Sequence, residues 1–152
     1  MRILALLTLL ALPGVSQDAW AQQSYHPSCF SAARTQAEMT VCAGDSYKVV
    51  DSILQRAVQE RRDSLTGGRR AQFDSAQGAW SAYATIECQF QASYFRDGTM
   101  ESMQDAFCRG QLSTARLQAV VGSLCDETRV QEASCPAARR YALPASLSDP
   151  GN

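Results

Sequence analysis

The residue types that commonly carry out catalysis are sparse in this sequence, and their spacing does not favour an active site. The one histidine, His26, precedes the region of helical periodicity, so a nucleophilic Ser or Cys would lack its usual activating base. Glu87 stands beside a cysteine, and Glu101 and Asp105 share a helix face, but carboxylates with such spacing usually face solvent. We therefore expect a binding protein that is not an enzyme, with no catalytic residue, no metal and no cofactor.

Cysteines are the most informative residues for the fold. The sequence contains six of them, Cys29, Cys42, Cys88, Cys108, Cys125 and Cys135. A close Cys-x-x-Cys pair, which zinc sites and redox centres usually contain, is absent from the sequence. An even number of cysteines behind a secretion signal is typical of disulfides. Their expected places on antiparallel helices favour nearest-neighbour pairing, which joins the first cysteine to the second, the third to the fourth and the fifth to the sixth.

Basic residues cluster around one glycine pair, Gly67-Gly68. They are Arg61, Arg62, Arg69 and Arg70. The glycine pair lacks the Lys and Ser/Thr of a phosphate-binding loop and instead predicts the end of a helix. The arginines could bind an anionic polymer, but we favour the simpler interpretation that they complement the dipole of a helix C-terminus.

Two aromatic residues, Trp80 and Tyr83, could stack on a ligand. Both fall on the expected inner face of a helix, where aromatic side chains more often belong to the core. Gln77 lies one turn before Trp80, and its amide could hydrogen-bond a buried backbone group or a tyrosine hydroxyl. We therefore expect these three residues to be structural.

The elements that position these residues are predicted to be helices. The run Thr35-Gln36-Ala37-Glu38 has the form of a capping box, which predicts a short helix from Thr35. Gly44-Asp45-Ser46 then predicts a break and a new helix start. Apolar residues at helical spacing predict long helices over about 47–65, 70–95 and 100–124, and no segment alternates with a period of two. The expected fold is all-α, a small disulfide-stapled helical bundle of three long helices plus a short N-terminal helix.

The N-terminal residues resemble a secretory signal. A positive start at Arg2, an apolar run over 3–12 and the small residues of Ala19-Trp20-Ala21 predict a signal peptide at 1–21. The apolar run is about half of the roughly 20 residues that span a bilayer, so we expect no stable membrane insertion after cleavage. The expected location is therefore periplasmic or secreted.

Cleavage after residue 21 would leave 152 − 21 = 131 residues, which is enough for one domain. We expect a flexible lead-in at 22–28 and a helical domain at 29–125. The remaining C-terminal extension, 126–152, is expected to hold a disulfide loop and a disordered tail from Leu143. The formal net charge of −1 gives no reason to expect a nucleic acid as partner.

Three blocks of residues carry a resemblance to a known family. The first is Cys29, Thr35-Gln36-Ala37-Glu38-Met39-x-x-Cys42-Ala43, Tyr47, Asp51 and Leu54. The second is Gln77-x-x-Trp80-x-x-Tyr83-x-x-x-x-Cys88, and the third is Gly98-Thr99-Met100-x-x-Met103-x-x-x-x-Cys108 with Leu112, Ser113 and Arg116. In this order they are similar to the LprI-like lysozyme-inhibitor domain family over about residues 29–124. The resemblance implies a secreted helical domain with four framework cysteines that inhibits lysozyme.

The expected partner is therefore a protein, such as lysozyme or another peptidoglycan hydrolase. The candidate target-binding turn is Arg96, Asp97, Gly98 and Thr99, because it offers a cation, a flexible glycine and a hydroxyl between two long helices. The simpler interpretation of these residues is a plain connector. The alternative function is a helical adaptor or immunity-like protein of the envelope, which would bind another protein without inhibiting lysozyme.

Overall fold

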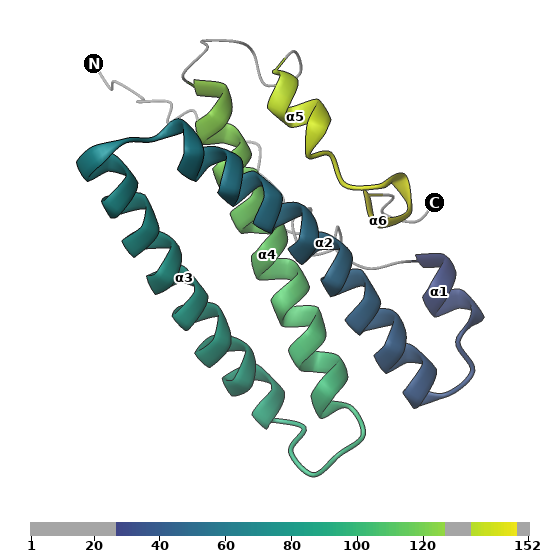
Figure 1. Ribbon diagram of the computed structural model, residues 1–152. Helices are drawn as coiled ribbons and strands as arrows, with labels where there is room; N and C mark the ends of the chain where they lie inside the picture. The colour runs from purple at the N-terminus through teal and green to yellow at the C-terminus, as the bar shows by residue number, and fades with distance from the viewer. Residues whose placement is uncertain (1–26, 127–134, 149–152) are drawn as a thin grey trace, which may run out of the picture.

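The computed structural model describes residues 27–126 and 135–148 (Figure 1). Within these ranges it has six helices, α1 (Pro27–Ala32), α2 (Gln36–Ser64), α3 (Gly67–Ser93), α4 (Glu101–Asp126), α5 (Pro136–Arg140) and α6 (Ala145–Ser148). The described residues form no strand, which confirms the prediction of a helical bundle with three long helices. None of these helices is long and apolar enough to cross a membrane. The predicted signal peptide and His26 lie outside the described residues.

The predicted break at Gly44-Asp45-Ser46 is wrong, because α2 continues through it from Gln36 to Ser64. The start of α2 was predicted correctly. The Glu38 backbone N–H donates to Thr35 Oγ1 at 3.2 Å, and the Thr35 N–H donates to the Glu38 carboxylate at 2.9 Å. A glycine inside a helix costs about 1 kcal/mol relative to alanine. The contact with α4, which extends over much of α2, offsets that cost.

The short N-terminal helix lies earlier in the chain than expected. It is α1, which includes the last two residues of the predicted flexible lead-in, Pro27 and Ser28. At the other end of α2 only Leu65 and Thr66 separate it from α3, and the two glycines form the first turn of α3 instead of a longer connection. Gly67 has a φ of 53°, a left-handed conformation that glycine adopts without steric cost.

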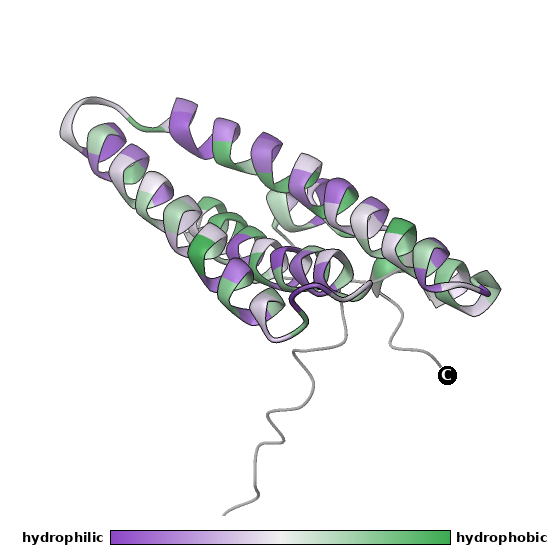
Figure 2. Cartoon of the chain, turned by 90° about the horizontal axis from the view of Figure 1, so that it is seen from below, coloured by the Kyte–Doolittle hydropathy of each residue, from purple (hydrophilic) through white to green (hydrophobic). Residues whose placement is uncertain are grey.

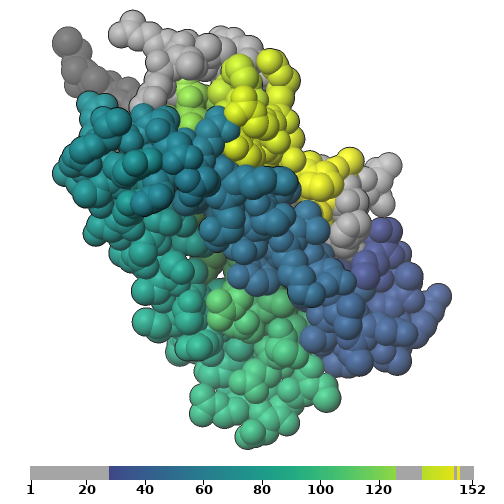
Figure 3. All heavy atoms as spheres, in the orientation of Figure 1, coloured from purple at the N-terminus to yellow at the C-terminus, as the bar shows by residue number. Residues whose placement is uncertain are grey.

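Helix α4 is the central element of the bundle. It packs extensively against α2 and, on another side, against α3, whereas the backbones of α2 and α3 approach each other closely at few positions (Figure 1). In the space-filling view the atoms of α2 and α3 meet near the connection between the two helices (Figure 3). Hydrophobic and hydrophilic residues alternate along the long helices, as Figure 2 shows, so none of them is apolar on all sides. Helix α3 is therefore attached to the rest of the molecule mainly along one face.

The hydrophobic core lies between α2 and α4. Its buried members are Ile53, Leu54 and Ala57 of α2, Leu117 and Val120 of α4, and Cys125, Cys135, Ala137 and Tyr141. Each fully buried leucine or valine contributes roughly 1.5–3 kcal/mol to stability. Trp80 of α3 packs against this cluster and is half-buried, which agrees with its predicted structural role.

The prediction of a disordered tail from Leu143 is wrong for residues 143–148. Leu147 of α6 is 1% exposed, and α6 contacts α1. In the segment before it, the Tyr141 hydroxyl donates to Glu60 of α2 at 2.6 Å, and the Arg140 guanidinium binds the same carboxylate. The prolines of this segment led to the prediction of disorder, although one apolar side chain, that of Leu147, packs against the bundle.

Three disulfides join the cysteines as nearest neighbours, as predicted. The Cα–Cα distances are 5.7 Å for Cys29–Cys42, 5.4 Å for Cys88–Cys108 and 5.7 Å for Cys125–Cys135. The first joins α1 to α2, the second joins α3 to α4, and the third joins α4 to the residue before α5. Covalent links therefore hold α1, α3 and the start of α5 to the α2–α4 pair.

Candidate functional site

The turn between α3 and α4, residues 94–100, projects from one end of the bundle (Figure 1). We call it the α3–α4 turn. Its backbone is fixed by local hydrogen bonds, from the Phe95 N–H to Ala92 at 2.9 Å and from the Gly98 N–H to Phe95 at 3.0 Å. Asp97 has a φ of 63°, and a Cβ on Gly98 would lie 3.0 Å from the Phe95 carbonyl oxygen. Gly98 is thus needed for a tight path of the chain and does not act as a free hinge.

The Cys88–Cys108 disulfide holds together the two helices that carry the α3–α4 turn. Its two cysteines are 0% and 4% exposed, so the bond lies inside the contact between α3 and α4. Each cysteine is about two helical turns or less from the end of its helix. The ends of the α3–α4 turn are therefore held at a fixed separation.

The four predicted contact residues of this turn, Arg96 to Thr99, are all exposed. Among the described residues Arg96 makes no ion pair, so its charge is available to a partner. A groove of about 630 Å³ lies beside the turn, and Arg96 and Glu101 are among its lining residues. The arrangement offers a cation and a hydroxyl at a rigid, protruding edge.

An exposed apolar stripe leads along α3 to this turn. It consists of Tyr83, Ile86, Phe90 and Tyr94, which are 52%, 68%, 56% and 74% exposed. Their spacing of three or four residues places them on one face of the helix, and the Phe90 and Tyr94 rings meet edge to face at 5.4 Å. We call these four residues the α3 stripe. Contiguous exposed apolar surface of this kind commonly marks a protein contact.

The prediction that Tyr83 belongs to the core is wrong. The inward face of α3 is formed by Ala84, Cys88 and Ala92, which are buried against α4. At about 100° per residue, Tyr83 points well away from that face. Sequence periodicity alone did not distinguish the two apolar faces of α3, because both contain residues at helical spacing.

Gln77 and Trp80 meet a residue that sequence reasoning had not connected with them. Arg116 of α4 donates from Nε to the Gln77 side-chain oxygen at 3.0 Å, and its guanidinium carbon lies 5.9 Å from the centre of the Trp80 ring. The second and third blocks of the resemblance thus converge on one half-buried arginine. The sequence around Arg116 gave no indication of this contact, because it depends on how α3 and α4 are aligned in the fold.

Two of the three carboxylates considered for catalysis, Glu87 and Asp105, are engaged in local contacts. Asp105 forms an ion pair with Arg109 at 2.7 Å, and this hydrogen bond raises the pKa of Arg109. Glu87 accepts a hydrogen bond from Gln91 at 2.8 Å. Within ranges 27–126 and 135–148 there is no group of three or more His, Cys, Asp or Glu that could hold a metal ion.

Comparison with known proteins identifies a family to which most of the described chain is similar. A family model described as "Lysozyme inhibitor LprI" matches residues 29–120. No curated protein and no solved structure matches the chain. The matched span includes the disulfides Cys29–Cys42 and Cys88–Cys108, the α3 stripe and the α3–α4 turn, and it excludes the Cys125–Cys135 disulfide.

Proposed function

Since this chain belongs to the LprI lysozyme-inhibitor family, we propose that it inhibits a lysozyme or another peptidoglycan-cleaving hydrolase by inserting the α3–α4 turn into the enzyme's cleft. The observation that carries the proposal is the exposed Arg96, which has no ion-pair partner in the described residues and stands on a turn held by a buried disulfide. The protein itself is proposed to be a binder and not an enzyme.

The chemistry of the target supports this choice of residues. Glycoside hydrolases place two carboxylates about 5–9.5 Å apart beside the bond that they cleave. A guanidinium can form charge-assisted hydrogen bonds to such a carboxylate, and the hydroxyl of Thr99 adds a further donor. Because the α3–α4 turn is already fixed, binding would require little additional ordering of the chain.

The α3 stripe would extend the contact beyond the cleft. Tyrosine and other aromatic residues, together with arginine, provide most of the binding energy in many protein interfaces. Tyr94 lies within the turn and Phe90 one helical turn before it, so both would contact the rim of a cleft that holds Arg96. An interface of standard size buries about 800 Å² on each partner, which the turn alone would not reach.

We also propose an extracytoplasmic location for this activity. The three disulfides are of the kind that forms and persists in oxidising compartments. The predicted signal peptide at 1–21 agrees with secretion and remains a prediction from the sequence. Peptidoglycan-cleaving enzymes act in the same compartments, so the protein would meet its target there.

The test is a lysozyme cell-wall lysis assay with the oxidised protein titrated against a fixed amount of enzyme. Arg96→Ala is expected to weaken inhibition by roughly 10- to 100-fold, the effect of losing a central interface arginine. Lys48→Ala is the matched control, because it removes one exposed cation, 76% exposed, from α2. Equal inhibition by Arg96→Ala and the parent protein would refute the choice of site.

A complete lack of inhibition by the parent protein, with its helical circular dichroism intact, would refute the proposed activity. The adaptor or immunity-like function would then be favoured, because the α3 stripe still presents an apolar surface suited to a protein partner. A pull-down with the α3 stripe intact and with Tyr94→Ser would identify such a partner.

A further inference from the structure

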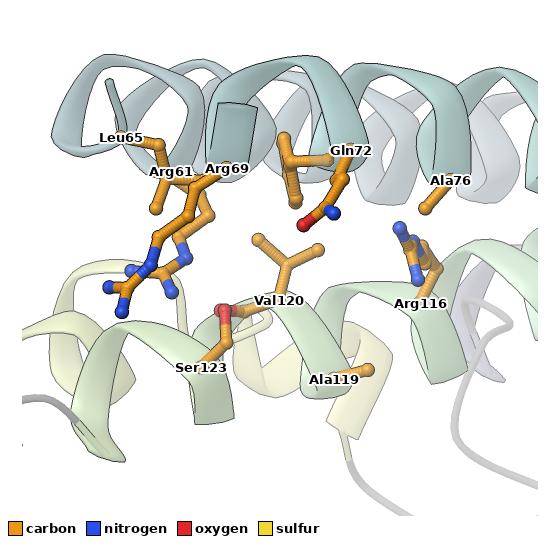
Figure 4. Close-up of a pocket in the computed structure, with 10 residues that line it drawn as sticks. Arg61, Leu65, Arg69, Gln72, Ala76, Arg116, Ala119, Val120 and Ser123 are labelled. Atoms are coloured by element: carbon orange, nitrogen blue, oxygen red, sulfur yellow. The ribbon is translucent and has the colours of Figure 1, made fainter. Parts of the chain in front are cut away.

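A hollow lies where α2, α3 and α4 meet, at the opposite end of α3 from the α3–α4 turn (Figure 4). Its volume is about 440 Å³. Arg69, near the start of α3, is 27 residues from Arg96, which corresponds to roughly 40 Å along a helix. The hollow is therefore separate from the proposed inhibitory surface.

The charged residues that line this hollow, among those the structure describes, are of one sign. They are Arg61, Arg69 and Arg116, with no acidic residue in the described part of the lining, so we call it the arginine hollow. Figure 4 shows Arg61 and Arg69 extending side by side toward Ser123, with Arg116 on the other side of Val120. Arginines from α2, α3 and α4 thus line one hollow, two of them with their guanidinium groups close together and the third apart from them.

Two acidic residues at this end of the bundle, Asp63 and Asp74, bind other arginines. Arg62 pairs with Asp74 at 2.9 Å, and Arg70 pairs with Asp63 at 3.0 Å. Arg70 also donates to the Arg62 carbonyl at the end of α2 at 3.0 Å, as expected for a cation that complements a helix dipole. Of the four clustered arginines, Arg62 and Arg70 therefore pair with carboxylates, and Arg61 and Arg69 line the hollow, where Arg61 also has contacts of its own.

Within the part of the chain that the structure describes, Arg116 is a cation held in place without a carboxylate partner. Its partners are the Gln77 side-chain oxygen at 3.0 Å and the Trp80 ring at 5.9 Å, and neither carries a charge. Partial burial lowers the pKa of Arg116, and no carboxylate opposes this effect. A partly desolvated guanidinium gains more from a counter-ion than one in bulk water, because the local dielectric constant is lower.

We propose that the arginine hollow binds a small organic oxyanion, a carboxylate or phosphate group attached to a short apolar chain. Arg69, which forms no ion pair within the described residues, and Arg116 would bind the oxyanion. Gln72 supplies a further donor at the same space, and Leu65, Phe73 and Val120 supply its apolar surface. A hollow of this volume with a few convergent polar groups is of the size of known small-molecule sites.

Trp80 provides a direct reporter of binding, because Arg116 lies over its ring. The experiment follows the indole N–H signal of Trp80 by NMR in the oxidised full chain with Trp20→Phe, which leaves Trp80 as the one tryptophan. The probes are hexyl phosphate, hexanoate and inorganic phosphate, and hexanol is the uncharged control. We expect saturable shifts with at least one charged probe and none with hexanol. The order of the three affinities identifies phosphate or carboxylate as the preferred group.

Two charge-matched variants separate a site from general attraction to positive charge. Arg69→Gln, on an exposed residue, is expected to weaken binding by about 10-fold or more, whereas Arg62→Gln removes a neighbouring cation outside the hollow and is expected to leave binding within about 2-fold. Equal weakening in both variants would overturn the proposal, as would no saturable shift up to about 10 mM of any charged probe. Lysozyme inhibition is not used as a readout, so this result is independent of the proposed function.

Discussion

Removing the Cys88–Cys108 disulfide by alanine substitution of both residues tests the role of the α3–α4 turn most directly. The bond closes a loop of 20 residues. The chain-entropy relation gives about 11 cal/mol/K for a loop of this size, or about 3.3 kcal/mol of lost stability at 25 °C. With a urea dependence of about 1–3 kcal/mol/M, the midpoint of unfolding should fall by roughly 1–3 M.

The Cys125–Cys135 disulfide is a matched control for this change. Its loop of 10 residues gives about 2.7 kcal/mol by the same relation, and its cysteines are also buried, at 3% and 1% exposed. It joins the far end of α4, roughly 35 Å along the helix from the turn. The two double variants should therefore lose similar stability for the same physical reason.

Inhibition should distinguish the two variants where stability does not. Both are compared by urea unfolding followed by circular dichroism, and then in the lysis assay at a temperature where both are folded. We expect only the loss of Cys88–Cys108 to weaken inhibition, because only that bond fixes the ends of the α3–α4 turn. Equal inhibition by the two folded variants would refute the reasoning, and a stability loss below about 1 kcal/mol would refute the loop-entropy argument.

Two further predictions concern the C-terminal segment. Leu147→Ala should reduce the free energy of unfolding, measured in urea, by about 2–5 kcal/mol because Leu147 is 1% exposed. The control Val41→Ala, at a residue 60% exposed, should stay within about 0.5 kcal/mol of the parent. The hydrogen bond from Tyr141, helped by Arg140, lowers the pKa of Glu60 below 4.5, so its stabilisation is present above that pH and is lost as the pH falls through the lowered pKa. Glu60→Gln should therefore lower the urea midpoint at neutral pH but not in acid, and parallel pH curves for the two proteins would contradict this assignment.

Features specified by nearby residues could be predicted from the sequence. The capping box of Thr35 and Glu38 depends on a short run of backbone, and it forms as predicted. Nearest-neighbour disulfides follow from helices that are connected by short turns. The helical class follows from apolar spacing and the absence of alternation. In each case the deciding interactions lie within about one helix and its neighbour in the chain.

Features specified by tertiary contact could not be predicted. Gly44 suggested a break, but the contact with α4 decided the continuity of α2. The pattern of α3 predicted one apolar face, and only the position of α4 shows that Tyr83 lies outside it. The burial of Leu147 in the proline-containing tail likewise depends on contacts with distant parts of the chain, so the sequence did not predict it.

The candidate sites divide in the same way. The α3–α4 turn was found from sequence, because it is a local connection between two predicted helices. The arginine hollow was not found from the sequence, because its arginines come from three helices. In addition, which of the clustered arginines form ion pairs depends on acidic residues 7–12 positions away, such as Asp63 and Asp74. The contact of Arg116 with Gln77 spans 39 residues, beyond the range of any local pattern.

The attachment of α3 along one face has a consequence for how this protein can change over evolution. Residues of the α3 stripe are more than half exposed and lie outside the buried face of α3, so exchanging them should alter the free energy of unfolding by about 0.5 kcal/mol or less. Under the proposed function, recognition and folding would thus be encoded by separate sets of residues. A lineage, or a laboratory library randomised at these positions, can explore new target specificities while the cysteines and the α2–α4 interior preserve the scaffold.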